Sequence, residues 1–311
     1  MTLAKECLPA VLRFVIYFEV KRIGSSMNRR DLLKNAITGA VALVMFPTLS
    51  FADDPAALRL AALEREHGGR LGVAALDTGS GRRIAHRGDE RFLICSTFKL
   101  LLVAVVLKRI DQGAEKLDRR LVLGEDALLE YAPITKQHVG TPGMSIAQLC
   151  EATIVWSDNT AANLLLASIG GPTAVTRFAR GLGDQFTLLD RIEPALNPHD
   201  TTTPKAMLAD MQKVLLGDAL SRPSRERLTR WLADCQTGLQ TLRAGMPAGW
   251  RIGDKTGQWD GDGFHASNDI AIVWPRHRKP LLVTAYYMTD SADVAARKAV
   301  LAEIGRIVAG L

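Results

Sequence analysis

The sequence predicts an α+β fold: an antiparallel sheet built from both chain ends, flanked by terminal helices, with an inserted all-helical domain. Strand patterns occur over residues 71–86 and return only after residue 270, whereas helical patterns dominate the stretch between them. Helical patterns also precede the first strand and follow the last one. With 311 residues, 47% hydrophobic and 23% charged, the composition is globular and excludes collagen, coiled-coil and disordered classes.

The first elements are a helix over residues 56–66 and two strands, Leu71–Leu76 and Arg83–His86. The glycine-rich segment Asp77–Gly81 between the strands predicts a tight hairpin. Its Asp-Thr-Gly also occurs in aspartic proteases, but that chemistry needs two carboxylates sharing a proton, and the sequence holds no second copy. The turn interpretation is therefore favoured.

The middle of the chain is predicted to form helices joined by Gly- and Pro-rich loops, and strand patterns return only near the C-terminus. Helices are predicted over Thr97–Ile110, Ser145–Trp156, Asn159–Ile169, Pro172–Leu182, Pro204–Leu215 and Ala292–Val308, and strands over Ile270–Trp274 and Leu281–Met288. We therefore predict an α/β domain of residues 53–90 and 221–311 and an all-α domain of residues 91–220.

Residues 1–52 have the composition of a transport leader. They hold seven basic and three acidic groups, which leaves 32 basic and 30 acidic groups in the rest of the chain. Arg29 and Arg30 precede an apolar stretch, Ala36–Phe46, and the small-residue site Ser50–Ala52. This order is typical of a signal peptide of the twin-arginine type. The stretch is shorter than the ~20 apolar residues that span a bilayer, which disfavours a membrane anchor.

The leader predicts export to the periplasm, with no stable membrane insertion after its removal. The apolar piece Val11–Phe18 is unusual upstream of such a leader, so Met27 is a candidate for the true start. The remaining chain is nearly neutral and has no long Lys/Arg run, so a nucleic-acid partner is not expected.

Cysteine and histidine usage gives no sign of a metal centre. Cys7 falls in the leader, and Cys95, Cys150 and Cys235 allow at most one disulfide in the mature chain. No Cys-x-x-Cys or His-Glu-x-x-His spacing occurs, and the six histidines are scattered. We expect neither a metal nor a cofactor.

The segment Ser96–Lys99 opens a predicted amphipathic helix. The spacing of three places the Ser96 hydroxyl and the Lys99 amine on one face, which suits an activated nucleophile. The N–H groups of a helix N-terminus would also stabilise an oxyanion. Alone the motif is weak, and a Ser N-cap followed by an exposed Lys is the favoured alternative.

Two further tripeptides favour the activated nucleophile over the N-cap alternative. Ser157-Asp158-Asn159 lies 61 residues after Ser96 in a loop between two helices, and Lys255-Thr256-Gly257 follows 98 residues later. Singly, the first could merely cap the next helix and the second could be an exposed edge strand. Together, in this order and separation, the three motifs resemble the serine β-lactamase and penicillin-binding protein superfamily.

A fourth element selects a branch of that superfamily. The segment Glu193–Asn197 has the Glu-x-x-Leu-Asn pattern of the Ω-loop in class A β-lactamases, and the peptidases of the superfamily lack this glutamate. The chain therefore resembles class A serine β-lactamases over essentially its whole mature length.

The resemblance implies a role for each motif residue. Ser96 attacks the lactam carbonyl and forms an acyl-enzyme, while Lys99, directly or with Glu193 through a water, removes its proton, an assignment disputed in the family. Ser157 passes a proton to the leaving nitrogen. Lys255 keeps Ser157 polarised and offers positive potential to the substrate carboxylate.

Binding roles follow from the same resemblance. Thr256 hydrogen-bonds the substrate carboxylate, and Asn159 holds both Lys99 and the amide of the substrate side chain. Tyr131 supplies an aromatic wall at the pocket mouth, with an ordinary half-buried tyrosine as the alternative.

The oxyanion hole and the water site complete the implied machinery. The backbone N–H groups of Ser96 and of Gln258, which follows Gly257, form the oxyanion hole. Glu193 and Asn197 hold the water that hydrolyses the acyl-enzyme.

The sequence departs from the family pattern in its pocket floor and its carboxylate site. After Asn197 the Ω-loop is several residues shorter than usual. The arginine that usually supports the substrate carboxylate is absent, since Thr241 and Asn268-Asp269-Ile270 stand at the two expected places. Lys255 and Thr256, assisted by His265, are left to bind it.

The disulfides of other family members are not expected here. Cys95 precedes the nucleophile, but Gln258 and Trp259 follow Gly257 where carbapenem-hydrolysing members carry a cysteine. Other members pair a cysteine at the position of Cys150 with one on the nucleophile helix, but here Val103 stands at that partner position. Three thiols are predicted.

We expect a monomeric, periplasmic hydrolase of small-molecule β-lactams. The alternatives are a peptidoglycan D,D-peptidase or esterase with the same Ser/Lys machinery, which Glu193 argues against, and a β-lactam receptor that acylates and stops.

Overall fold

The computed structural model describes residues 54–192, 200–261 and 263–311. This part of the chain contains a five-stranded antiparallel sheet of order β2-β1-β9-β8-β7. The strands are β1 (Arg70–Asp77), β2 (Arg83–His86), β7 (Arg251–Asp260), β8 (His265–Trp274) and β9 (Leu281–Thr289). The predicted pairing of early and late strands is confirmed, because β1 lies along β9 from Arg70↔Met288 to Asp77↔Leu281.

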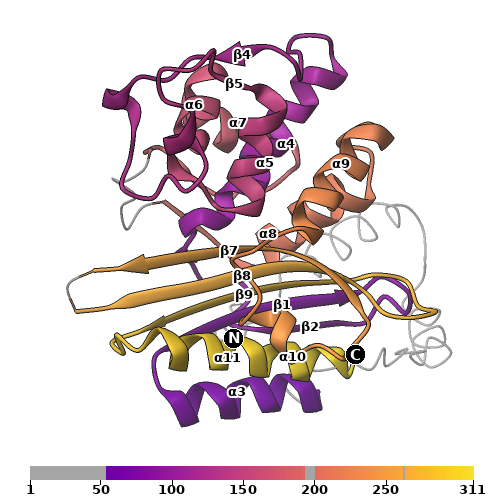
Figure 1. Cartoon of the computed structure of the whole chain (residues 1–311). Helices are drawn as coiled ribbons and strands as arrows, with labels where there is room; N and C mark the ends of the chain where they lie inside the picture. The colour runs from indigo at the N-terminus through magenta and orange to yellow at the C-terminus, as the bar shows by residue number, and fades with distance from the viewer. Residues whose placement is uncertain (1–53, 193–199, 262) are drawn as a thin grey trace, which may run out of the picture. The chain divides into compact units, whose positions relative to one another are not determined.

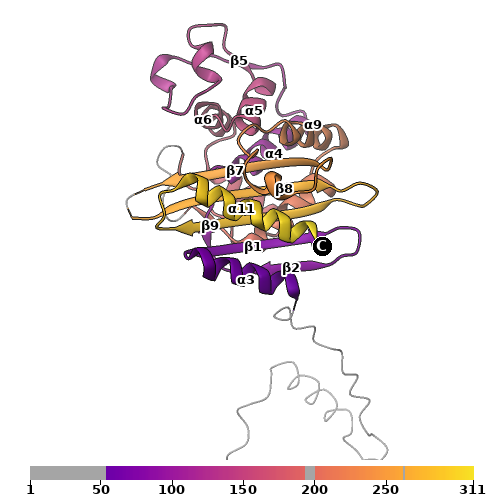
Figure 2. The ribbon, with the colours of Figure 1, turned by 60° about the horizontal axis from the view of Figure 1, so that its bottom comes forward.

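Helices from the two ends of the described chain cover one face of the sheet. α3 (Pro55–His67) and α11 (Val294–Ala309) pack against each other there, and the short α10 (Leu242–Gly245) packs on α11 (Figures 1 and 2). Side chains of β1 alternate between the two faces, as strand geometry requires. Leu71 and Val73 join the core under α3 and α11, whereas Ala74 and Leu76 join the core on the other face.

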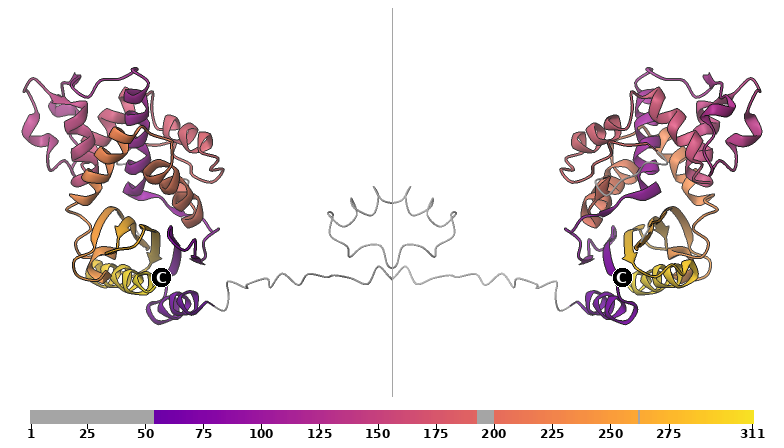
Figure 3. Two further views of the ribbon diagram at one scale, coloured as in Figure 1. Left: turned by 90° about the vertical axis from the view of Figure 1, so that its right-hand side faces the viewer. Right: turned by 90° about the vertical axis from the view of Figure 1, so that its left-hand side faces the viewer.

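The opposite face of the sheet carries the helical layer, seen above the sheet in Figure 1 and from both sides in Figure 3. Its helices are α4 (Phe98–Asp111), α5 (Ile146–Val155), α6 (Asn159–Ser168), α7 (Thr173–Gly181), α8 (Pro204–Met211) and α9 (Arg222–Ala233). Two small two-stranded pairs, β3 (Phe92–Leu93) with β6 (Thr201–Thr202) and β4 (Arg120–Leu121) with β5 (Met144–Ser145), complete the regular structure.

α4 is the central helix of this layer. All ten residues of Phe98–Leu107 are buried, and α5, α6, α7 and α9 pack around them. The amphipathic character predicted for this helix is therefore wrong over its first ten residues, because a helix enclosed by other helices is apolar on every side.

The other predicted elements mostly agree with the structure. The helices that precede β1 and follow β9 are confirmed, and α5, α6 and α7 begin and end within two residues of their predicted bounds. The α-helix predicted to reach Leu215 ends at Met211, and a π-helical turn, Gln212–Leu216, follows it directly. The predicted turn after β1 is confirmed: Asp77 Oδ1 accepts from the N–H of Gly79 at 2.8 Å.

For β7 the sequence indicates only an exposed edge strand at Lys255–Gly257, as the alternative to a site motif; an edge strand is present there, but Lys255 is fully buried. β7 extends over ten residues at the edge of the sheet and pairs with β8 along its whole length. The strand contains Gly253, Asp254 and Gly257, residue types that are depleted in strands, so its pattern lacks apolar alternation.

The cysteines of the described chain are present as thiols, as predicted. Cys95, Cys150 and Cys235 are all buried and none forms a disulfide. Burial raises the pKa of Cys150 far above the usual range and that of Cys235 to about 11, so these two are packing groups rather than nucleophiles. Among the described helices, none has the length and apolarity needed to cross a membrane.

The contact between α10 and α11 depends on a glycine. A Cβ added at Gly305 would lie 2.3 Å from Leu242 O, whereas one added at Gly181 on α7 would meet nothing within 4 Å. We expect Gly305→Ala to lower the free energy of unfolding in urea by about 1–3 kcal/mol through overpacking. Gly181→Ala is the control, with a neutral or slightly stabilising effect of up to ~1 kcal/mol. Equal unfolding midpoints for the two variants would contradict this packing.

Candidate active site

A cleft of about 760 Å³ lies where the edge strand β7 meets the helical layer. Seven of the predicted site residues line it, and they come from four segments of the chain: Ser96; Tyr131; Ser157 and Asn159; and Thr256, Gly257 and Gln258. Lys99 and Lys255 lie behind this lining and contact it through hydrogen bonds. The structure thus brings the three sequence motifs together at one place.

Ser96 lies in a tight turn, not within the α-helix that follows. A 3-10 turn, Cys95–Thr97, precedes α4, and Cys95 has a positive φ of 43°. Such a conformation is rare for residues other than glycine and typical of functional sites. The alternative of a Ser N-cap with an exposed Lys is wrong, because Thr97 is the N-cap and Lys99 is fully buried.

The side-chain nitrogens of Lys99 and Lys255 converge on Ser157. Both lysines are fully buried. Lys99 Nζ donates to Ser157 O at 2.8 Å and to Ser157 Oγ at 3.3 Å, and Lys255 Nζ donates to Ser157 Oγ at 2.9 Å. The hydroxyl therefore lies between two lysine nitrogens, one from α4 and one from β7.

This arrangement directs the proton of Ser157. A hydroxyl has two acceptor lone pairs and one donor hydrogen. Because two lysine nitrogens donate to its acceptor side, its hydrogen is left for a third acceptor in the cleft. Ser157 also has a positive φ of 58°, a strained conformation that costs ~1–3 kcal/mol. Ser157 can thus serve as a proton donor to a bound ligand.

Asp158 and Asn159 combine structural and site contacts. Asp158 caps α6 by accepting from Ala161 N at 2.9 Å, and it also accepts from Thr135 N at 2.9 Å. Asn159 Oδ1 accepts from Lys99 Nζ at 2.5 Å, and Asn159 N donates to Tyr131 O at 3.0 Å. The predicted capping role is therefore correct for Asp158, and Asn159 additionally contacts Lys99. Tyr131 is 49% exposed at the edge of the cleft.

β7 passes directly against the turn Cys95–Thr97. A Cβ added at Gly257 would lie 2.9 Å from Cys95 Cβ and 3.1 Å from Ser96 N, so only glycine permits this approach without movement. The backbone of Gln258 consequently runs beside Ser96. Lys255 Nζ also donates to the carbonyl oxygen of Thr256 at 2.7 Å, which fixes the strand at this point.

Several lining residues carry no sequence signal of a site. Thr237, in the loop after α9, makes a 2.6 Å hydrogen bond with the Thr256 hydroxyl, and Lys298 on α11 also lines the cleft. Both come from segments without a recognisable motif. His265 is absent from the described lining of the cleft, and its Nδ1 lies 2.9 Å from Asp260 Oδ1.

Buried carboxylates lie behind Lys255. Asp254 pairs with Arg243 at 2.8 Å, and Asp269 accepts from Thr241 Oγ1 at 2.6 Å. Burial, together with the nearby charge of Asp254, raises the pKa of Asp269 well above its usual range. Thr241 stands at a position considered for the missing arginine, and its hydroxyl is hydrogen-bonded to Asp269.

Glu193 and Asn197 lie outside the described residues. The chain on either side of them is held firmly: Leu188 and Thr201 exchange backbone hydrogen bonds of 2.9 and 3.1 Å. Asp200 O also accepts from Ile94 N at 3.0 Å, two residues before Ser96. The described chain that follows residues 193–199 is thus tied to the turn that contains Ser96.

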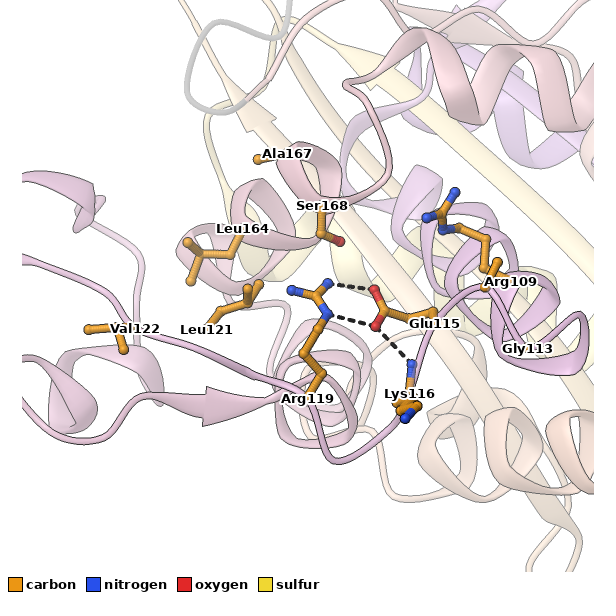
Figure 4. A pocket seen from close by; sticks show the side chains of 11 residues that line it. Arg109, Gly113, Glu115, Lys116, Arg119, Leu121, Val122, Leu164, Ala167 and Ser168 are labelled. Carbon is orange, nitrogen blue, oxygen red and sulfur yellow. Dashed lines mark hydrogen bonds and ion pairs between the residues drawn. The ribbon is translucent and has the colours of Figure 1, made fainter.

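A second cavity, of about 670 Å³, lies among residues of the helical layer (Figure 4). Its best-defined contact is the ion pair of Arg119 with Glu115, in which Arg119 Nε donates at 2.7 Å. The Arg119 guanidinium holds the pKa of Glu115 below its usual range. Because none of the predicted site residues lines this cavity, the cleft at Ser96 is the candidate active site.

Known proteins match this chain over nearly all of its described part. The model of the β-lactamase enzyme family matches residues 55–310. β-Lactamase L2 of Stenotrophomonas maltophilia is 48% identical over 259 residues, covering 81% of this chain and 84% of that protein. A β-lactamase of Streptomyces fradiae is 45% identical over 261 residues, covering 81% and 84%.

Solved structures agree with these relatives. An ancestral class A β-lactamase (GNCA) is 56% identical, with a TM-score of 0.78, and the match covers 81% of this chain and 98% of that one. A β-lactamase of Xanthomonas campestris is 49% identical, with a TM-score of 0.79 and coverages of 84% and 98%.

The fold and the cleft define a serine enzyme with Ser-x-x-Lys machinery. The chain belongs to the β-lactamase enzyme family, and within it to class A, whose members hydrolyse β-lactams through a serine acyl-enzyme. The predicted family, fold class and enzyme class are confirmed.

The close approach at Gly257 can be tested by substitution. In Gly257→Ala the new methyl would push the strand away from Ser96, and we expect kcat/KM for a β-lactam to fall about 10- to 100-fold. Gly253→Ala on the same strand is the matched control, because its Cβ would be similarly crowded, 3.0 Å from Leu232 Cβ, but against α9. A stability loss without a rate loss is expected for the control. Equal kcat/KM for both variants would refute the special importance of Gly257.

Proposed function

We propose that this enzyme opens the β-lactam ring of antibiotics with Ser96 as the nucleophile and Glu193 as the residue that activates the deacylating water. The observation that carries the proposal is the convergence of Lys99 and Lys255 on Ser157 in the cleft that Ser96 lines. Both lysines are held by short hydrogen bonds inside the protein, so the site is organised before a substrate binds.

Acylation uses the groups around Ser96. Ser96 Oγ attacks the lactam carbonyl carbon while Lys99 as the neutral amine, or Lys99 with Glu193 through a water, takes its proton. The backbone N–H groups of Ser96 and Gln258 stabilise the oxyanion, where one donor contributes about 2.7–4 kcal/mol. The ring C–N bond then breaks as Ser157 gives its proton to the leaving nitrogen, and Ser157 is reprotonated by the group that took the Ser96 proton.

Substrate binding relies on charge and hydrogen bonds along β7. Lys255 supplies positive potential for the substrate carboxylate and the Thr256 hydroxyl donates to it. Asn159 binds the amide of the acyl side chain as well as Lys99, and Tyr131 forms an aromatic wall at the mouth.

Deacylation separates this function from its alternatives. Glu193 and Asn197 hold a water, Glu193 takes its proton and the hydroxide attacks the ester carbon; as the ester bond breaks, that proton passes to Ser96 Oγ and the opened product leaves. A D,D-peptidase of the same superfamily lacks such a glutamate, and a β-lactam receptor stops at the acyl-enzyme. The Glu-x-x-Leu-Asn pattern therefore favours hydrolysis.

Nitrocefin turnover tests the function. We expect residues 53–311 to hydrolyse nitrocefin over many cycles and Ser96→Ala to abolish this, because the ester can no longer form. Acylation of one equivalent without turnover would instead support the receptor, and activity on D-Ala-D-Ala peptides alone would support the peptidase.

Loss of the water-activating group is expected to trap the intermediate. In Glu193→Ala, mass spectrometry after mixing with benzylpenicillin should show the acyl-enzyme accumulating, because its ester is no longer attacked rapidly. Glu125→Ala removes an exposed carboxylate elsewhere and is the control, with normal turnover. Rapid turnover by Glu193→Ala would disprove the role given to Glu193.

We also propose that residues 1–52 direct export to the periplasm through the twin-arginine route. We propose further that the mature enzyme is a monomer and confers antibiotic resistance there. The two consecutive arginines before the apolar stretch support the route. Replacing Arg29 and Arg30 together by lysine should leave the enzyme inside the cytoplasm in a cell-fractionation assay. Unchanged periplasmic activity would disprove this route, and a dimer on size-exclusion chromatography would disprove the monomer.

A further inference from the structure

The end of the β7–β8 hairpin is fastened by one carboxylate. Asp260 is the last residue of β7 and lies opposite His265, the first residue of β8. Asp260 Oδ1 accepts from Arg297 Nη2 at 2.6 Å and lies 2.9 Å from His265 Nδ1, and Oδ2 accepts from Gln258 Nε2 at 2.7 Å. One side chain therefore connects β7, β8 and α11.

Arg297 depends on this carboxylate. Its side chain is 1% exposed, and Asp260 is its ion-pair partner within the described ranges. The Nη1 contact with Ala266 O is long, 3.5 Å, and Nε has no hydrogen-bond partner among the described residues. A buried guanidinium without its counter-charge is strongly disfavoured, so Asp260 is the group that keeps Arg297 in place.

Asp260 remains ionised despite its partial burial. Burial works against the charged form, but hydrogen bonds from Gln258, Arg297 and His265 outweigh it and hold the pKa of Asp260 below its usual range. The contact with Arg297 is thus a charged hydrogen bond, which is stronger than a neutral one.

The position of β7 matters because β7 is an edge strand. Its backbone ladder joins it only to β8 within the described sheet, and its other edge lies beside the nucleophile turn. A Cβ at Gly257 would already lie 3.1 Å from Ser96 N. A sideways shift of β7 would therefore change the separation between the Gln258 N–H and Ser96.

We propose that Asp260 is a positioning residue for the reaction: through Arg297 and His265 it fastens the end of β7 and so sets the place of the Gln258 N–H relative to Ser96. This inference rests on the proposed function, in which that N–H stabilises the oxyanion. Asp260 acts through the strand, although it also lies on the wall of the cleft.

The chain offers a matched control for a purely structural role. Asp77 ends β1 just as Asp260 ends β7, and it also accepts from three donors: Gly79 N, Ser80 Oγ and, at 3.0 Å, Arg278 Nη2. Asp77 does not line the cleft. Its removal should cost stability without affecting catalysis.

The test compares Asp260→Ala and Asp77→Ala in the full chain. We expect Asp260→Ala to lower kcat/KM for nitrocefin about 10- to 100-fold, mainly through kcat, since a displaced oxyanion donor weakens only the transition state. Affinity for phenylboronic acid, which forms a tetrahedral adduct with a catalytic serine, should fall in parallel. Asp77→Ala should lower the unfolding temperature but keep kcat/KM within about twofold.

Two further variants keep the proposal testable if Asp260→Ala folds poorly. Asp260→Asn retains one acceptor and should lose less activity, and the double variant Asp260→Ala/Arg297→Met should be no slower than Asp260→Ala, because both residues act through one contact. Normal kcat in a folded Asp260→Asn and Asp260→Ala, or a rise in KM alone, would overturn the inference. If the unaltered enzyme itself fails to turn over nitrocefin, the proposed function fails instead.

Discussion

Two buried lysine side chains on either side of one hydroxyl are the constraint on which this active site depends. Lys99 comes from the central helix and Lys255 from the edge of the sheet, so the two layers of the fold meet with two amine nitrogens at one hydroxyl. Burying such polar groups is costly unless oxygen acceptors take their hydrogen bonds. Among the described residues these acceptors include Ser157 O and Oγ, Asn159 Oδ1 and Thr256 O.

The same constraint explains the local strain. Cys95 and Ser157 both have left-handed backbone conformations, and each lies at or next to a hydroxyl of the site. Such conformations persist only when the surrounding packing fixes them. Cys95 packs with Leu93 and Ala266, and Asp158 ties its loop to α6 and to Thr135. Strain at the reacting groups is thus balanced by ordinary apolar and capping contacts nearby.

The sequence predicted the layers of this fold well because apolar periodicity reports burial. It indicated β7 only as a possible edge strand at Lys255–Gly257, because glycine at the approach to Ser96 and buried Asp254 and Lys255 obscure the rest of the strand pattern. The motif residues Ser96, Ser157 and Thr256 were identified by spacing and resemblance. Thr237 and Lys298 were not identified, because they reach the cleft only through the tertiary fold.

The free thiols described above mean that folding of this part of the chain involves no oxidation step. The described chain holds its native conformation without any covalent cross-link between distant segments. Among the described residues, therefore, no disulfide has to form for these segments to reach the fold, and none can be lost to a reductant.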